Sequence, residues 1–497
     1  MPQLSLSRQT LWQAGARICS FVLSVAFPVY LARHLTRSEL GVYKQIFMVV
    51  QSAMTYLPLG FFMSAFHFLT REPEKKNSFV LNILLVQATA GFGGALVLFT
   101  FPHRIALFLK DPELERFAAR VSVLIFLWTL CAFLDTLAQA NQEPRVASFA
   151  IVFFQVSRSA LMLFAAFWFG TVSAIVNAAL VQAVLQTTIL AFYLHTRFPG
   201  LWRSFDPVAL KRQLSYSLPL SASGLLYLGQ LDIHNYVVSH EFSPGQFAIY
   251  SNGCLDVPLV SIISDSVGYV MIPKISALQK TGDRDEIVRL TCTTIHKLSL
   301  MFFPIYVYLL IVGRDLIELL YSKLYRESGP IFLMSLSLLP FLVLMMDPIM
   351  RAYAETRSFL LKLNLTITLV QIPMILIFVR KFGLVGAIGA VVLTGIASRI
   401  ASTWRVVTLL HVRKGELPQL NSLPRVALAA VASGALTLWA KSALGPLAHW
   451  QTIIGAGMVF VPCYVSAIFA IGALRGEEKA SLRLMFSHWA ERFGITG

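Results

Sequence analysis

Fourteen long apolar stretches follow one another along almost the whole of this chain. A helix needs about 20 mostly apolar residues to cross the hydrocarbon core of a bilayer. Only helices and closed barrels satisfy their backbone polar groups in lipid, and stretches of this length exceed a barrel strand. The sequence therefore predicts an all-α polytopic membrane protein with about 14 transmembrane helices. The expected spans cover residues 11–32, 45–66, 79–102, 121–142, 146–169, 171–194, 214–238, 247–272, 291–313, 331–350, 363–379, 382–404, 426–440 and 450–474.

The composition agrees with a chain that lies mostly in lipid. Charged residues make up 13% of it and hydrophobic residues 56%, whereas soluble domains carry about 25% charged residues. The first apolar stretch contains Arg17 and leads directly into further spans, so we expect a retained helix and not a cleaved signal peptide. The five cysteines form no ligand-spaced cluster, so no metal or other cofactor is expected.

The formal net charge of +16 is distributed unevenly between the two sides of the membrane. With the N-terminus placed in the cytoplasm, the predicted inner segments hold more than twice as many Lys and Arg residues as the outer segments. This bias predicts that both termini are cytoplasmic. Basic loops that face anionic membrane lipids account for the positive charge, so we expect no binding of nucleic acid.

One short motif occurs twice. Residues 35–43 (LTRSELGVY) follow the first apolar stretch, and residues 242–250 (FSPGQFAIY) follow the seventh, after an interval of 207 residues. Both copies read apolar, hydroxyl, two variable residues, Glu or Gln, apolar, small, β-branched and Tyr. Six spans separate the copies, so the repeat is parallel. Secondary transporters are often built from such repeats, with the substrate site between the halves.

The first copy also carries a family resemblance. Residues 31–43 (LARHLTRSELGVY) resemble the turn LAR-L-x-x-x-x-[FL]-G-x-Y of polysaccharide flippases, the Wzx-type branch of the multidrug/oligosaccharidyl-lipid/polysaccharide (MOP) superfamily. Residues 268–274 (GYVMIPK) resemble the end of that family's eighth helix. The resemblance implies two six-helix bundles around a central cavity, residues 1–200 and 201–412. Two additional transmembrane helices and a basic cytoplasmic tail would then occupy residues 413–497.

The same resemblance implies a function. A polyprenyl-diphosphate-linked oligosaccharide would move across the bacterial cytoplasmic (inner) membrane by alternating access. This step would serve the synthesis of a surface polysaccharide such as O-antigen, capsule or exopolysaccharide. The polymerase and glycosyltransferases of the pathway would be partners. The family has no fixed motif for the cations of its cavity, so site residues must come from this sequence itself.

Charged residues within the spans are the candidate site residues. Each costs about 2.5–3.5 kcal/mol on insertion scales, so each needs a partner, a wet cavity or a route to the headgroups. A diphosphate favours cations, because guanidinium binds phosphate oxygens in a bidentate way. The candidate substrate-binding residues are therefore Arg17, Lys44, Arg158 and Arg399. Arg17 and Lys44 could instead snorkel to a membrane surface, and Arg158 could form a buried ion pair with Asp135.

The intramembrane carboxylates lie mainly in the second half of the chain. Asp232 shares a polar face of the seventh span, and Asp256 and Asp265 lie nine residues apart, on opposite faces of the eighth. A buried carboxylate can take up a proton or coordinate a sodium ion, so these three are candidates for coupling to a counter-ion. They could instead only hydrogen-bond neighbouring helices. Asp347 and Arg351 are one turn apart, which predicts a local ion pair.

Two other functions remain open at this stage. A cation-coupled multidrug exporter of the same superfamily should line its cavity with carboxylates and aromatic residues, and Arg17 and Arg158 argue against it. A membrane-embedded polysaccharide polymerase or glycosyltransferase needs catalytic groups in a large outer loop. The longest outer loops, 103–118 and 314–329, carry no catalytic or metal-ligating arrangement. The sequence thus favours a flippase that is not an enzyme.

Overall fold

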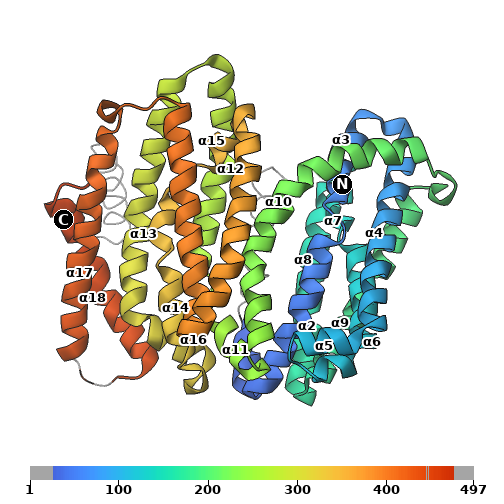
Figure 1. Ribbon diagram of the computed structural model, residues 1–497, viewed down its shortest axis with the longest axis horizontal. Coiled ribbons are helices and arrows are strands. Elements are labelled where there is room, and N and C mark those ends of the chain that lie inside the picture. The colour runs from blue at the N-terminus through green and yellow to red at the C-terminus, as the bar shows by residue number, and fades with distance from the viewer. Residues whose placement is uncertain (1–25, 444, 446, 475–497) are drawn as a thin grey trace, which may run out of the picture. The chain divides into compact units, whose positions relative to one another are not determined.

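The computed structural model describes residues 26–443, 445 and 447–474, and over these residues the protein is helical and contains no strand (Figure 1). The longer helices are α2 (Arg37–Tyr56), α4 (Lys76–Thr100), α6 (Glu113–Cys131), α8 (Pro144–Phe169), α9 (Val172–Arg197), α10 (Pro207–Glu241), α12 (Pro258–Thr281), α13 (Arg284–Tyr321), α16 (Arg357–Leu409), α17 (Leu423–Ala443) and α18 (His449–Ala470). The shorter helices are α3 (Ser64–Arg71), α5 (Pro102–Phe108), α7 (Leu134–Ala140), α11 (Pro244–Gly253), α14 (Ser328–Leu336) and α15 (Asp347–Ala352). Short 3-10 turns connect several of them, among them η1 (Phe61–Met63) and η4 (Lys323–Tyr325).

The predicted class, an all-α polytopic membrane protein, is confirmed. Nine helices of the described residues are long and apolar enough to cross a membrane, or ten if the bent pair formed by α2 with η1 and α3 is one span. The predicted number of 14 is not confirmed. The first expected span, residues 11–32, lies mostly outside the described residues. The seventh corresponds to α10, which is long but carries recurrent polar residues.

Three breaks interrupt the long helices or separate neighbouring spans. The axis bends by 43° between α2 and the segment Phe61–Arg71. The expected eighth span is divided at residues 254–257, which are not helical and precede Pro258 at the start of α12. In α16, Gly383 has φ 61° and ψ −141°, a conformation that glycine adopts without steric cost. This break separates the eleventh and twelfth expected spans.

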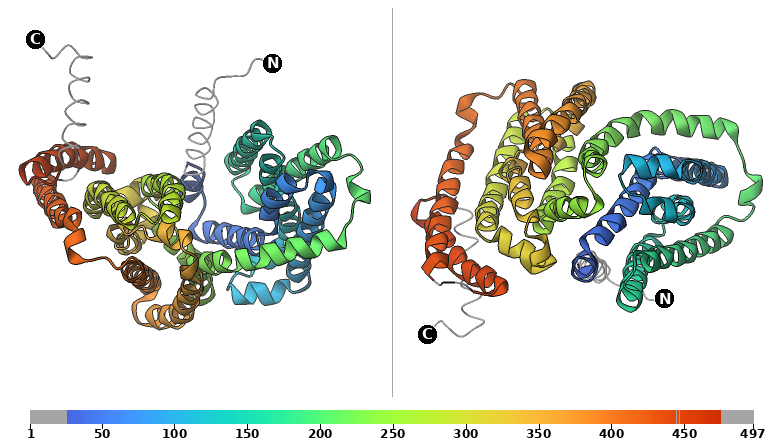
Figure 2. Two further views of the ribbon diagram at one scale, coloured as in Figure 1. Left: turned by 90° about the horizontal axis from the view of Figure 1, so that it is seen from above. Right: turned by 60° about the horizontal axis from the view of Figure 1, so that its bottom comes forward.

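The chain forms two compact units, residues 1–251 and 252–497. In the described part of the first unit, α4, α6, α8 and α9 pack together, and α10 is a long helix that contacts α2, α3 and α4 (Figure 2). In the second unit, α13 packs against both α17 and α18, which lie side by side (Figure 1). Helices α10 and α11 thus pack in the first unit, and the six-helix division of the chain stays a prediction.

The repeated motif starts a helix in both of its copies. Thr36 Oγ1 accepts from the Glu39 amide at 3.3 Å, and the Glu39 carboxylate accepts from the Thr36 amide at 2.9 Å. Ser243 and Gln246 form the same reciprocal pair at the start of α11, at 3.5 and 3.2 Å. Hydroxyl and Glu or Gln three residues apart form a capping box, which satisfies two backbone donors at a helix start. The sequence repeat is therefore a repeated helix-initiation signal.

Candidate functional site

Arg158 lies midway along α8 against two aromatic rings of the first unit. Its guanidinium carbon is 4.1 Å from the ring centroid of Trp128 on α6 and 6.0 Å from that of Phe47 on α2. The negative face of an aromatic ring attracts a cation, most strongly where water is excluded. Helices α2, α6 and α8 therefore hold Arg158 in a half-buried aromatic cage without neutralising its charge.

A buried hydrogen bond fixes the larger ring of this cage. The indole Nε1 of Trp128 donates to Gln182 Oε1 on α9 at 2.8 Å, and both side chains are at most 2% exposed. A buried indole N–H without a partner would be costly, so Gln182 sets the orientation of the ring that faces Arg158. The sequence analysis missed Phe47, Trp128 and Gln182. The only sequence feature that could have indicated them is the presence of aromatic and amide residues near the middle of neighbouring spans, at the same membrane depth as Arg158.

Asp135 and Arg158 do not form the ion pair that was considered for them. Among the described residues, no carboxylate forms an ion pair with Arg158, and Asp135 pairs with no basic side chain. Arg158 contacts Trp128, and Trp128 precedes Asp135 by seven residues in the sequence. Seven residues are about 10 Å along a helix, and α6 ends at Cys131 before α7 begins. The expected pair between Asp135 and Arg158 is therefore not formed.

Of the other three predicted substrate cations, Lys44 has a different partner in the first unit. Lys44 Nζ donates to Ser251 Oγ at 3.0 Å. Arg399 is a half-buried residue of α16, in the second unit. Arg17 lies outside the described residues. Arg158 is thus the candidate whose surroundings the structure defines best.

Asp232 on α10 accepts a hydrogen bond from the hydroxyl of Tyr56, the last residue of α2, with 2.6 Å between Tyr56 Oη and Asp232 Oδ2. Buried polar contacts hold α10 at either side of this pair. Gln213 Nε2 donates to Ser64 Oγ at 3.1 Å. At the other side, Gln45 Nε2 donates to Ser239 Oγ at 2.6 Å. Asp232 is thus held on α10 between two further side-chain contacts to the first part of the chain.

Asp256 and Asp265 belong to the second unit, and both are exposed there. The interpretation that they occupy opposite faces of one helix was wrong. Residues 254–257 are not helical, so Asp256 precedes α12 and only Asp265 lies on it. The rotation of 100° per residue relates two side chains only within one continuous helix, so it does not predict the faces of residues on either side of a break. Tyr269, one turn after Asp265, is 78% exposed.

Asp347 and Arg351 form the ion pair that their spacing predicts, with 2.6 Å between Arg351 Nε and Asp347 Oδ2 within α15. Both side chains are about half exposed or more, so the pair contributes little to stability. Each of the two charged side chains thus has the other as its partner within the same helix.

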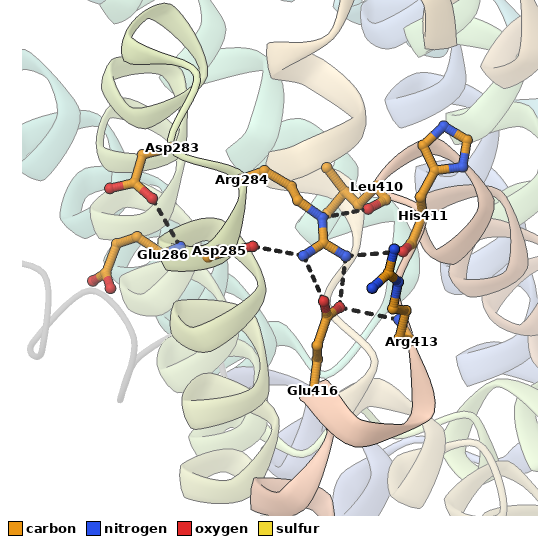
Figure 3. A network of polar contacts seen from close by, with 8 residues as sticks. All are labelled: Asp283, Arg284, Asp285, Glu286, Leu410, His411, Arg413 and Glu416. Carbon is orange, nitrogen blue, oxygen red and sulfur yellow. Dashed lines mark hydrogen bonds and ion pairs between the residues drawn. The ribbon is translucent and has the colours of Figure 1, made fainter.

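A stronger charge network, which the sequence analysis missed, lies at the start of α13 (Figure 3). Arg284 binds both carboxylate oxygens of Glu416, at 2.9 and 2.6 Å, and donates to the backbone carbonyls of Leu410 and His411 at 2.6 and 2.9 Å. The Arg284 guanidinium lowers the pKa of Glu416 to about 2. This contact ties the segment after α16 to α13.

Among the described residues, no group of three or more His, Cys, Asp and Glu side chains could hold a metal ion. The site therefore consists of a caged cation on α8 and a carboxylate on α10.

The sequence profile of a family described as polysaccharide biosynthesis protein matches residues 30–330, more than half of the chain. The chain belongs to this family. The matched residues include the capping motif at 35–43, the aromatic cage of Arg158 and Asp232. No curated protein matches its sequence.

Solved structures show which fold this family member has. The lipid II flippase MurJ, in an inward closed conformation, superposes with a TM-score of 0.72 at 16% identity, over 94% of this chain and 100% of that one. An inward-facing MATE multidrug resistance transporter of the MOP superfamily gives 0.61 at 16% identity, over 79% and 94%. A MATE transporter from Vibrio cholerae gives 0.57 at 13% identity, over 82% and 97%. The fold is therefore that of MOP superfamily transporters.

Proposed function

We propose that this protein is a flippase for a polyprenyl-diphosphate-linked oligosaccharide and that Arg158 binds the diphosphate. The single observation that supports this most directly is the cage of Arg158, which holds the cation against Trp128 and Phe47 with no carboxylate of a described residue paired to it. The fold shared with the lipid II flippase supports the same substrate class.

The surroundings of Arg158 determine whether its positive charge is available to a ligand. A carboxylate partner would cancel the positive field of Arg158, whereas an aromatic face stabilises the cation and leaves its N–H donors available. An anionic headgroup that enters such a site gains charge-assisted hydrogen bonds in a medium of low dielectric constant. An organic cation would be repelled there, which argues against multidrug export.

We propose further that Asp232 carries the coupling cation, a proton or a sodium ion. Tyr56 donates one hydrogen bond to Asp232 Oδ2, and that bond is compatible with either a bound cation or a protonated carboxyl group. Alternating access follows if substrate and cation prefer opposite conformations of the protein, each by a few kcal/mol of differential binding. Asp256 and Asp265 stay secondary candidates.

Deletion of the gene tests the proposed function directly. Cells without the protein should assemble the lipid-linked oligosaccharide but keep it on the inner leaflet of the cytoplasmic membrane, and the surface polysaccharide should be lost. The position of the unit is measured by its accessibility, in intact cells and in inverted vesicles, to an impermeant glycan-cleaving enzyme. Failure to assemble the unit would instead support a polymerase or glycosyltransferase, and unchanged export would reject the flippase.

A further inference from the structure

The second unit contains a charged cavity of about 920 Å³. It lies at the end of α13, beside the last residues of α17 and the first residues of α18. Its basic lining residues are Arg314, Lys323, Arg326, Lys441 and His449, and its acidic ones are Asp315 and Glu318. The remainder of the lining is apolar: Leu310, Ile311, Leu333 and Leu447. The cavity is thus amphipathic, and it belongs to a different unit from the caged arginine.

The acidic side chains of this cavity are already occupied. Asp315 binds Lys441 Nζ at 2.7 Å and His449 Nδ1 at 2.9 Å. Glu318 contacts His449 Nε2 at 3.3 Å and Arg326 Nε at 3.5 Å. These contacts join α13 to α17, α18 and the segment after η4, so the walls of the cavity are held in place by charge-assisted hydrogen bonds.

Positive charge remains after this pairing. Arg314, Lys323, Arg326 and Lys441 give four cations against two carboxylates, with His449 counted as neutral. Arg314 and Lys323 are exposed and form no ion pair with a described residue. A concave site with an excess of Arg and Lys concentrates anions, and guanidinium is suited to phosphate oxygens.

A second cavity of about 180 Å³ continues from the first between α17 and α18, and the two share Asp315, Lys441 and Leu447. Four of its polar lining residues already have partners: Asp315 and Lys441 pair with each other, and the hydroxyls of Thr437 and Thr452 bond within their own helices. Thr437 Oγ1 donates to Ser433 O, and Thr452 Oγ1 donates to Ala448 O. The small residues Ala440, Gly455 and Ala456 leave the space open. This cavity therefore suits a hydrocarbon chain better than a polar group.

The position of the cavities relative to lipid is marked by tryptophan. Trp439 on α17 and Trp450 on α18 are 72% and 53% exposed, and both lie within a few residues of the helix ends that form the cavities. Exposed tryptophan is enriched at the level of the lipid headgroups. The charged cavity is therefore at headgroup depth, and the narrow one points toward the hydrocarbon core.

We propose that this pair of cavities binds one membrane phospholipid, with its phosphate in the basic cavity and an acyl chain in the narrow one. Arg314 and Lys323 recognise the phosphate. The network of Asp315, Lys441 and His449 holds α17 and α18 against α13 and so shapes the entrance for the chain. A free phosphate ion would use only the first cavity, whereas a phospholipid would also place an acyl chain in the second. Occupation of the narrow cavity therefore distinguishes a phospholipid from free phosphate.

The test measures lipid retention by native mass spectrometry of the purified full-length protein. The probes are dioleoylphosphatidylglycerol, dioleoylglycerol, which lacks the phosphate, and glycerol 3-phosphate, which lacks the chains. We expect retention of the phospholipid alone. The double variant Arg314→Gln, Lys323→Gln should retain it at least about tenfold more weakly, a change of about 1.4 kcal/mol.

Two further variants make the result specific. The matched control Arg380→Gln, Lys381→Gln removes the same two charges from exposed residues of α16 that do not line the cavities, and it should retain the lipid as the parent does. At Gly455 an added Cβ meets no atom within 4 Å, so Gly455→Leu can fill the narrow cavity without moving the backbone and should also weaken retention. An unchanged unfolding temperature confirms that each variant is folded.

Three outcomes would overturn the proposal. Equal loss in the control variant would show that general surface charge holds the lipid. Glycerol 3-phosphate binding as tightly as the phospholipid would show a site for a free anion. Retention of dioleoylglycerol at the same level would show that the phosphate is not recognised.

Discussion

Lys44 Nζ donates a hydrogen bond to Ser251 Oγ at 3.0 Å, and these two residues are 207 positions apart, which is the interval of the sequence repeat. Lys44 follows the first copy of the capping motif directly, and Ser251 follows the second in the same way. The two copies of the motif are therefore packed against each other.

The same contact depends on a glycine. A Cβ at Gly41 would lie 1.9 Å from the carbonyl oxygen of Pro244, which is backbone and cannot rotate away. In the second copy of the motif, a Cβ at Gly245 would meet nothing closer than 3.6 Å. The approach of α2 and α11 thus requires glycine at position 41 but not at 245.

We expect Gly41→Ala to destabilise the protein by about 1–3 kcal/mol, the usual cost of overpacking a tight contact. The measurement is thermal unfolding in detergent, where the unfolding temperature should fall. Gly245→Ala is the matched control, since it makes the same change in the other copy of the motif and should leave the unfolding temperature nearly unchanged. Equal effects of both substitutions would contradict the close approach.

The apolar spans and the capping motif could be predicted from the sequence because both depend on neighbouring residues only. Span length follows from local hydrophobicity, and the capping box of Thr36 and Glu39 needs four consecutive residues. The breaks were harder to predict. The expected eighth span runs through residues 254–257 without a gap, so hydrophobicity alone gives no sign that the helix is interrupted there. Near Gly383, by contrast, Arg380 and Lys381 already separate two expected spans.

The partners of the charged residues could not be predicted, since they come from helices far apart in the sequence. The cage of Arg158 uses Phe47 and Trp128, and the partner of Asp232 is Tyr56. Helical periodicity places residues on a face of their own helix, but it does not say which helix covers that face. For this reason Asp135 was an incorrect choice of partner for Arg158.

We expect Arg158→Gln to reduce transport of the lipid-linked oligosaccharide by about 10- to 100-fold, because hydrogen bonds to charged groups contribute about 1.5–3 kcal/mol. Folding should be nearly unaffected, since no carboxylate loses its partner. Arg158→Lys should retain part of the activity, because it keeps the charge and loses the planar fork. Flipping by reconstituted protein, measured with a fluorescent substrate, checks all three expectations.

Two controls accompany this prediction. Arg120 also stacks on a ring, with 4.8 Å to the centroid of Phe117, but it donates to Ser173 and Asn177 at 2.7 and 3.1 Å. Arg120→Gln should leave transport unchanged. The double variant Arg158→Gln, Asp135→Asn should be as inactive as the single one. Recovery of transport in the double variant would show that Arg158 only balances Asp135.

The ion pair of Arg284 and Glu416 predicts a pH dependence of stability. Since the folded state lowers the pKa of Glu416 from 4.5 to about 2, the stabilisation is fully present above pH 4.5 and is lost as the pH falls toward 2. Glu416→Gln should therefore lower the unfolding temperature at pH 6 and have little effect near pH 2. Arg289→Gln, which breaks the exposed pair with Glu286, is the control and should change the unfolding temperature less at pH 6. An effect of Glu416→Gln that does not vary with pH would contradict the charged pair.

Asp232→Asn separates coupling from structure at the contact with Tyr56. Asparagine keeps a carbonyl oxygen that can accept the Tyr56 hydroxyl, at 2.6 Å in the parent, but it neither takes up a proton nor neutralises a cation. Transport should therefore persist without responding to an imposed proton or sodium gradient, as measured in proteoliposomes. Tyr56→Phe removes the donor and keeps the carboxylate, so the response to the gradient should remain. Asp256→Asn, at an exposed position outside the helices, should respond as the parent does. If Asp232→Asn also responds as the parent does, the carboxylate on α10 is not the coupling site.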